Sequence, residues 1–239
     1  MCIRDSYYIH DNVMHDLECS GGENMMIGNT GETDYVWNNI IYNLGSSQVP
    51  SGPQNSGQTG MSTYFWNNTI VDPSAGGCYT YSSQSGDQYN VINFQDNNCI
   101  SSASSALGSG FNVTTLTNAN NTLQTASAAD SNTSPNYNQY TASQTYAYSP
   151  VASTNSTVGA GANLASSYPA GFATSDTLYG CSETSVSGVT ESVCPGRASN
   201  SRPASGGGAW DTGAYVFSSA STPATDSASG LTFHGVTLQ

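Results

Sequence analysis

An asparagine-centred motif that recurs at a nearly fixed spacing is the feature that most constrains the fold of this chain. The motif spans residues 8–14, 35–41, 64–70 and 94–100. In each copy an aromatic residue stands four positions before the anchor, Asp or Asn stands one before it, and Met or Ile stands two after it. The anchors are 27, 29 and 30 residues apart (39−12, 68−39, 98−68) and are Asn12, Asn39, Asn68 and Asn98. Self-similarity at this period predicts stacked repeats rather than chance asparagine-rich loops.

The residue types favour repeats built from short β-strands. Leu is scarce and no segment keeps a 3.6-residue apolar period, which disfavours leucine-rich and helical repeats. Asn tolerates the left-handed backbone of a tight turn, and equivalent asparagines in stacked coils can form an amide ladder. The apolar residue two positions later would then face the core. The sequence therefore predicts an all-β parallel β-helix, a solenoid with coils of about 22–30 residues, and a degenerate fifth copy at Asn121.

The charge of the chain is low and strongly one-sided. Its 239 residues include 16 Asp and Glu but only 3 Lys and Arg, giving a formal net charge of −13. The three basic residues are Arg4, Arg197 and Arg202. Nucleic acids and anionic membrane surfaces both attract clustered Lys and Arg, so we expect neither as a partner. No apolar run is long enough for a transmembrane helix, and we expect a monomer.

The two ends of the chain differ from the repeats. Residues 1–6 resemble a spurious translated leader, in which case upstream coils are missing; a genuine short N-terminus is the alternative. We expect the β-helix to span 7–217, with regular coils over 7–125 and looser coils and a closing segment over 126–217. Residues 218–229 have the composition of a linker. Residues 230–239 are either a tail or the truncated start of a further β domain.

Five cysteines lie beyond the leader, and two of them suggest a disulfide. Cys181 and Cys194 flank a Ser/Thr/Gly loop, so we expect a bridge that closes this loop. Cys78 and Cys99 either pair between neighbouring coils or remain free buried thiols, and Cys19 is left over. None has the CxxC spacing of a zinc site. Together with the Ser/Thr/Asn-rich composition, the cysteines favour an oxidising, secreted or cell-surface setting.

The C-terminal part carries a more specific pattern. It reads SP at 149–150, VGAGANL at 158–164, SRP at 201–203 and AWDTGAY at 209–215. With the asparagine repeats, this ending resembles that of bacterial secreted right-handed β-helix proteins of the pectin-lyase-like superfamily, although Thr212 and Val216 replace the usual Ile and Glu. The resemblance implies a right-handed parallel β-helix. It implies much less about activity, because the superfamily includes lyases, hydrolases, epimerases and non-catalytic adhesins.

The chain contains few of the residues that enzymes of that superfamily use for catalysis. Its lyases use a Lys or Arg base, but the chain has no Lys, and we expect Arg202 to hold the closing segment through Asp211 or a carbonyl. Its hydrolases need two carboxyl groups held apart. We expect no cofactor and no metal site; Ca²⁺ bound by loop carboxylates is the alternative, although no calcium-loop motif supports it. The carboxylate candidates are Asp11, Asp16, Glu18, Glu23, Glu32 and Asp34, with His10 and His15 nearby.

Asp11 has a simpler expected role than catalysis. It occupies the turn position that Asn38 and Asn67 fill in neighbouring copies, so we expect it to be structural. His10 stands where Trp37 and Trp66 stand, and we expect it on the surface of the same strand.

Four aromatic residues of the repeats are the candidates for carbohydrate binding. If Ile9, Val36 and Phe65 face inward, strand alternation points the candidates outward as an exposed strip that suits neutral sugars. The other register buries these rings as core, in keeping with the usual burial of large aromatics. A one-residue slip separates the two arrangements. The four residues are Tyr35, Trp37, Tyr64 and Trp66.

The sequence is therefore compatible with two functions. The first is an extracellular β-helix module that binds polysaccharide or cell-surface glycan and is non-catalytic within this fragment. The second is the C-terminal part of a polysaccharide lyase or glycoside hydrolase whose catalytic coils lie mostly upstream. The shortage of Lys and Arg residues that could act as a catalytic base favours the first function. The negative charge weighs against polyanionic ligands unless Ca²⁺ bridges them.

Overall fold

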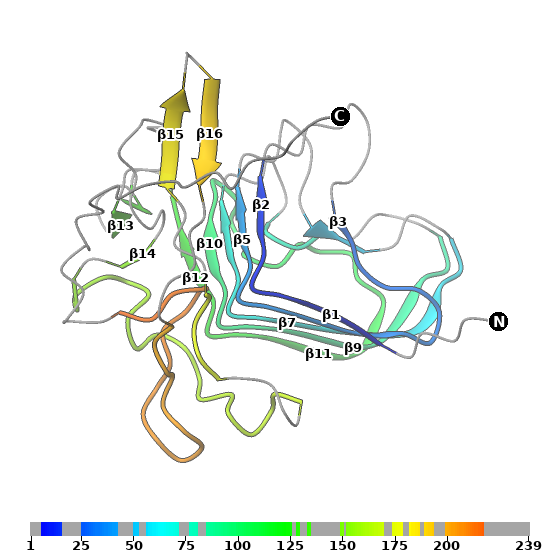
Figure 1. Ribbon diagram of the computed structural model, residues 1–239. Coiled ribbons are helices and arrows are strands. Elements are labelled where there is room, and N and C mark those ends of the chain that lie inside the picture. Colours follow the sequence, from blue (N-terminus) through cyan, green and yellow to red (C-terminus); the bar gives the residue numbers. More distant parts are fainter. Residues whose placement is uncertain are drawn as a thin grey trace, which may run out of the picture.

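The chain forms an all-β structure dominated by two parallel sheets (Figure 1). The computed structural model describes residues 6–15, 25–42, 50–52, 56–71, 77–80, 85–125, 128–129, 133–134, 149–150, 152–169, 174–178, 182–186, 189–193 and 199–217. Within these ranges no helix has the length and apolar character needed to cross a membrane.

Sheet A takes one strand from each repeat. Equivalent motif residues pair side by side, as Val36 does with Phe65 and Phe65 with Phe94. These three side chains are fully buried, so they point to the inner face, and their neighbours in each strand point outward. The strands lie in the order β1 (Ser6–His10), β4 (Thr33–Trp37), β7 (Thr59–Trp66), β9 (Gln88–Gln95) and β11 (Val113–Ala119).

Sheet B receives the next strand of each repeat after a two-residue corner. Figure 1 shows the strands of sheet A turning into the shorter strands of sheet B at this corner. The pairing is again parallel, and its strands are β2 (Val13–His15), β5 (Ile40–Tyr42), β8 (Thr69–Val71), β10 (Asn98–Ile100) and β12 (Thr122–Gln124).

Smaller pairings complete the described strands. β3 (Met25–Met26) pairs in parallel with β6 (Pro50–Ser51), and parallel bridges join Ser51 to Thr80 and Tyr79 to Leu107, so the return path of each repeat also stacks. β13 (Thr133–Ser134) pairs with β14 (Ser149–Pro150), and β15 (Ser182–Val186) with β16 (Val189–Val193), both antiparallel.

The first residue of every corner has a left-handed backbone. Asp11, Asn38, Asn67, Asp96 and Asn120 have φ between 50° and 58°. Asn and Asp accept this conformation at lower cost than other non-glycine residues, because their short side chains bond locally. Asp11 therefore holds the structural turn position expected from the sequence. We call these five residues the corner column.

The second residue of every corner builds an asparagine ladder. Asn12 donates from its backbone and side-chain amides to Oδ1 of Asn39, and the same pair of bonds links Asn39 to Asn68, Asn68 to Asn97, and Asn97 to Asn121. Each Asn from the second repeat onward also donates to a carbonyl of sheet A one repeat back. The ladder thus satisfies polar groups that the corner would otherwise bury unpaired.

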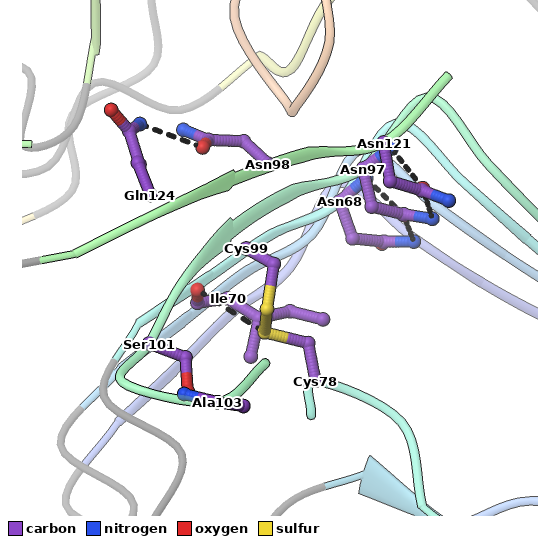
Figure 2. Close-up of a disulfide and its surroundings, with 10 residues drawn as sticks. All are labelled: Asn68, Ile70, Cys78, Asn97, Asn98, Cys99, Ser101, Ala103, Asn121 and Gln124. Carbon is purple, nitrogen blue, oxygen red and sulfur yellow. Dashed lines mark hydrogen bonds between the residues drawn. A yellow bond between two sulfur atoms is a disulfide. The ribbon is translucent and has the colours of Figure 1, made fainter. Parts of the chain in front are cut away.

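The prediction that Asn98 belongs to the ladder is wrong by one residue. Asn97 holds that place, whereas Asn98 pairs with Thr69 in sheet B, and its Oδ1 accepts from Gln124 Nε2 at 2.9 Å (Figure 2). The cause is Phe94, which pairs with the inward Phe65 rather than with the outward Tyr64. Asn121, the fifth copy, is confirmed as a ladder member.

The corrected register places Cys99 in the core. The inward column of sheet B runs through Met14, Ile41, Ile70, Cys99 and Leu123. Cys99 forms a disulfide with Cys78, with a Cα–Cα distance of 5.9 Å and both residues fully buried (Figure 2). Of the two alternatives for this pair, the disulfide is therefore the one found. The expected bridge between Cys181 and Cys194 lies outside the described residues.

Residues from far along the chain pack on the outside of the corner. We call residues 155–168 and 202–217 the closing segment. Its Ala214 and Tyr215 cover the outer face of sheet B beside Ile40, Val71 and Ile100. Its Leu164, Tyr168 and Trp210 cover the adjoining part of sheet A. Arg202 holds the segment through carbonyls, donating to Ser175 O at 2.6 Å and Gly213 O at 3.1 Å.

Candidate functional site

The outer face of sheet A is where the structure places the predicted carbohydrate-binding residues. The inward burial of Val36 and Phe65 selects the register in which Tyr35, Trp37, Tyr64 and Trp66 point outward. Two neighbouring outward columns result. One contains His10, Trp37, Trp66 and Gln95, and the other contains Tyr8, Tyr35, Tyr64 and Asn93.

The expectation of an exposed strip of four aromatics is wrong for the tryptophans. Trp37 and Trp66 are only 2% and 1% exposed. Tyr168 lies over both rings, with centroid distances of 6.0 Å to Trp37 and 5.1 Å to Trp66, and Leu164 and Trp210 belong to the same cluster. Both alternatives were therefore partly right: the rings point outward, but the closing segment converts them into a second core.

The tyrosine column remains accessible at its edges. Tyr8 is 49% exposed, and Tyr35 and Tyr64 are partly buried. The rings stack face to face, with centroids 5.4 Å apart for Tyr8 and Tyr35 and 4.9 Å apart for Tyr35 and Tyr64. Because each face of Tyr35 is covered by a neighbouring ring, this ring offers solvent its edge and hydroxyl rather than a flat face. We call Tyr8, Tyr35 and Tyr64 the tyrosine stack.

Uncharged and mostly polar residues flank the tyrosine stack. The next outward column contains Thr33, Ser62, Val91 and Thr115, and Asn93 follows Tyr64 in the tyrosine column. Burial raises the pKa of the Tyr35 phenol, and the neighbouring Tyr64 and Tyr8 add to the effect. The phenol of Tyr35 is therefore a neutral hydrogen-bonding group at physiological pH. A strip of hydroxyls can donate to and accept from a polyhydroxylated ligand.

Asp34, a carboxylate candidate, lies inside the repeat stack rather than on this strip. It is 1% exposed, pairs with Thr63, and neither carboxyl oxygen has a hydrogen bond of good geometry. Burial raises the pKa of Asp34 to about 7, the charge of Glu32 adds to this, and the Tyr7 backbone amide lowers it in part. Burial also raises the pKa of Tyr79 to about 12 within the same interior. Asp34 cannot reach a substrate on the outside.

The remaining candidates do not assemble into one acid–base site. Asp11 Oδ2 and His10 Nδ1 are 2.8 Å apart at the first corner, and Glu32 accepts from Asn29. Asp16, Glu18, Glu23 and the side chain of His15 lie outside the described residues. In the described part of the chain, no three His, Cys, Asp or Glu residues cluster as metal ligands would.

Asp96 is a residue whose importance the sequence analysis missed. It is fully buried at the corner, and its Oδ1 accepts from the backbone amide of Ala162 in the closing segment at 2.9 Å. Burial raises the pKa of Asp96 to about 7, although the Ala162 amide and the nearby Arg202 charge both lower it. In the correct register the sequence does place an acid between the corner amides of Asn67 and Asn120; the other acid of the column, Asp11, lies at its end.

Comparisons with known proteins place no constraint on this site: no family model, no curated protein and no solved structure matches the chain.

Proposed function

We propose that this chain is part of an extracellular, right-handed parallel β-helix module that binds a neutral polysaccharide or cell-surface glycan along the outer face of sheet A, without transforming it. The single observation that carries the proposal is the partly exposed, uncharged strip formed by the tyrosine stack and the adjoining Thr33 and Ser62. Stacked parallel strands at three positions per repeat support the β-helix assignment. The resemblance of the closing segment to the ending of pectin-lyase-like proteins also supports this proposed β-helix assignment.

The geometry of the strip favours a particular mode of binding. Because neighbouring rings cover the ring faces within the stack, sugars would be held mainly by hydrogen bonds to phenol, hydroxyl and amide groups. Repeats of a glycan could follow the strand direction or the stacking direction, in which strands lie about 4.8 Å apart. The net charge of −13 disfavours polyanionic glycans.

A non-catalytic role agrees with the placement of the acids. Asp34 and Asp96 are the described carboxyl groups with raised pKa values, and both are buried away from the strip. A glycosidase would need two carboxyl groups facing the same glycosidic bond. The described part of the strip contains no charged side chain in the Tyr35 and Thr33 columns.

The test is a glycan-array screen with the whole chain, followed by titration of the best neutral ligand. Replacing Tyr35 and Tyr64 together by Phe keeps the stack but removes both hydroxyls. Each lost hydrogen bond is worth about 1 kcal/mol, so we expect the double variant to bind roughly thirtyfold more weakly.

The matched control is Ser104→Ala, because Ser104 is exposed and follows β10 of sheet B, outside the columns of the strip. This variant should bind like the wild type. Equal affinity of the wild type and the Tyr double variant, or no neutral ligand at all, would overturn the proposal. Release of oligosaccharide in the same assay would favour the enzyme alternative instead.

A further inference from the structure

The corner column makes hydrogen bonds to the closing segment and to the neighbouring residues 174–178. Asn38 Nδ2 donates to Ser175 O at 2.8 Å, and Asn67 Nδ2 donates to Asp211 O at 3.2 Å. Asn67 also accepts from the hydroxyl of Tyr168 at 2.9 Å. These corner side chains are neutral amides, which can donate and accept in a buried site without a charge penalty.

Asp96 is the next position of this column and carries a carboxyl group instead. Its Oδ1 accepts from the Ala162 amide, and its backbone oxygen accepts from the Gly213 amide at 2.7 Å. Its Oδ2 is buried and has no hydrogen-bond partner in the described structure. Gly161 packs directly on the carboxyl, since a Cβ there would lie 2.9 Å from Oδ2. The closing segment therefore seals Asp96 from water.

The charged and titratable groups around Asp96 do not neutralise it. Arg202 is the facing cation, but two of its nitrogens are committed to the carbonyls of Ser175 and Gly213, and it forms no ion pair with Asp96. Tyr168 faces the site from the closing segment, and burial raises its pKa, so it stays neutral. Asp211 is the acid of the closing segment in this region, and its two oxygens accept from the backbone amides of Gly159 and Phe217.

The same contacts control access to the buried tryptophans. Ala162, Leu164 and Tyr168 lie within a few residues of one another, and Leu164 and Tyr168 cover Trp37 and Trp66. Loosening the segment at Asp96 would therefore uncover these rings. Their exposure would extend the outer face of sheet A beyond the tyrosine stack.

We propose that Asp96 is a proton-controlled latch, which holds the closing segment over Trp37 and Trp66 while its carboxyl is neutral and loosens the segment when it ionises. This inference is independent of glycan binding. The direction follows from the raised pKa: with the segment docked the group prefers its proton, whereas in water it loses it near 3.8. The docking free energy is therefore fully present below about pH 4, falls as pH rises to about 7, and stays low above that.

The test is hydrogen exchange of the whole chain at several pH values, with protection factors corrected for the intrinsic exchange rate. The protection of peptides covering 157–168 should fall by up to tenfold per pH unit between about pH 4 and 7. Peptides covering the ladder at 64–71 report on global unfolding, which exposes both Asp34 and Asp96, and their protection should exceed that of 157–168 at every pH. Acrylamide quenching is a second readout, because all three tryptophans of the chain lie in the covered cluster.

Asp96→Asn is the decisive variant, because it matches the amides of Asn38 and Asn67 and cannot ionise. Its closing-segment protection should be independent of pH over this range. Asp34→Asn, which removes the other buried carboxyl with a raised pKa, should leave the pH dependence at 157–168 unchanged. An unchanged pH dependence in Asp96→Asn would overturn the proposal. So would equal protection of the closing segment and the ladder at every pH in the wild type, because the segment would then open only on global unfolding; this result stands even if Asp96→Asn fails to fold.

Discussion

The side-chain oxygen of Asn68 accepts two hydrogen bonds from Asn39, one from its backbone amide at 3.1 Å and one from its side-chain amide at 2.9 Å. The side-chain amide of Asn68 in turn bonds Asn97 Oδ1 and the carbonyls of Val36 and Trp66. One fully buried side chain thus ties three repeats together. Repeats that bury their faces only against each other depend on such links between neighbours.

The ladder should contribute strongly to stability in its middle and weakly at its end. Asn68→Ala leaves several buried partners unsatisfied, so we expect a loss of about 3 kcal/mol in the free energy of unfolding. Asn12 is exposed at the end of the ladder, and Asn12→Ala should cost about 1 kcal/mol or less. Asn98→Ala, outside the ladder, should also cost only about 1 kcal/mol. Urea denaturation measures all three, and equal losses at Asn68 and Asn98 would contradict the assigned register.

The Cys78–Cys99 disulfide should be a stabilising crosslink. The two residues are 21 apart in sequence, and closing a loop of that length lowers the entropy of the unfolded chain by the equivalent of about 3 kcal/mol. The double variant Cys78→Ala/Cys99→Ala should therefore unfold at clearly lower urea concentration. Both sulfurs belong to fully buried residues, so a reductant should act only after the native protein opens. Rapid reduction of the native protein at low temperature would count against this burial.

The sequence predicts the repeat much better than it predicts the surroundings of the repeat. Corner asparagines and inward apolar residues follow from short-range turn chemistry and strand alternation, whereas the direction of the aromatics stays open between two registers. The fourth repeat misled this reasoning because Asp96, Asn97 and Asn98 are all corner-forming types. Only pairing with neighbouring strands, in which Phe94 lies beside Phe65, selects Asn97.

The burial of the tryptophans could not be predicted from the repeat at all. Trp66 is covered by Tyr168, and the related bond from Tyr168 to Asn67 spans 101 residues of sequence. Local patterns carry no information about such a contact. The resemblance of residues 201–215 to a known closing sequence indicated that a segment would end the fold, but not which face it would cover.

Two glycines of the closing segment should respond differently to a methyl group. Gly213 has φ +88°, and a Cβ there would lie 2.7 Å from both Asn98 Cβ and Thr69 Oγ1. Gly159 has φ +65° with nothing within 4 Å of its Cβ position. Gly159→Ala should therefore show only the backbone cost of about 1–2 kcal/mol, whereas Gly213→Ala adds a steric clash and should cost more. Thermal denaturation and the hydrogen-exchange protection of residues 157–168 should be measured for both variants. A smaller loss of stability in Gly213→Ala than in Gly159→Ala would contradict the docking geometry.

The buried carboxyl of Asp34 should make the protein more stable in acid than at neutral pH. Because its pKa rises from 3.8 to about 7 on folding, the folded state binds more protons than the unfolded state between these values. Stability therefore falls as pH rises from about 4 to 7 and is lowest above that range. Asp34→Asn removes this penalty, so it should be nearly neutral at pH 4 and stabilise by at most about 4 kcal/mol at pH 8. Glu32→Gln, which removes a charge that raises the pKa of Asp34, should shift the midpoint of the wild-type profile to lower pH. Urea denaturation across this pH range is the measurement, and a profile for Asp34→Asn parallel to the wild type would show that Asp34 does not titrate on unfolding.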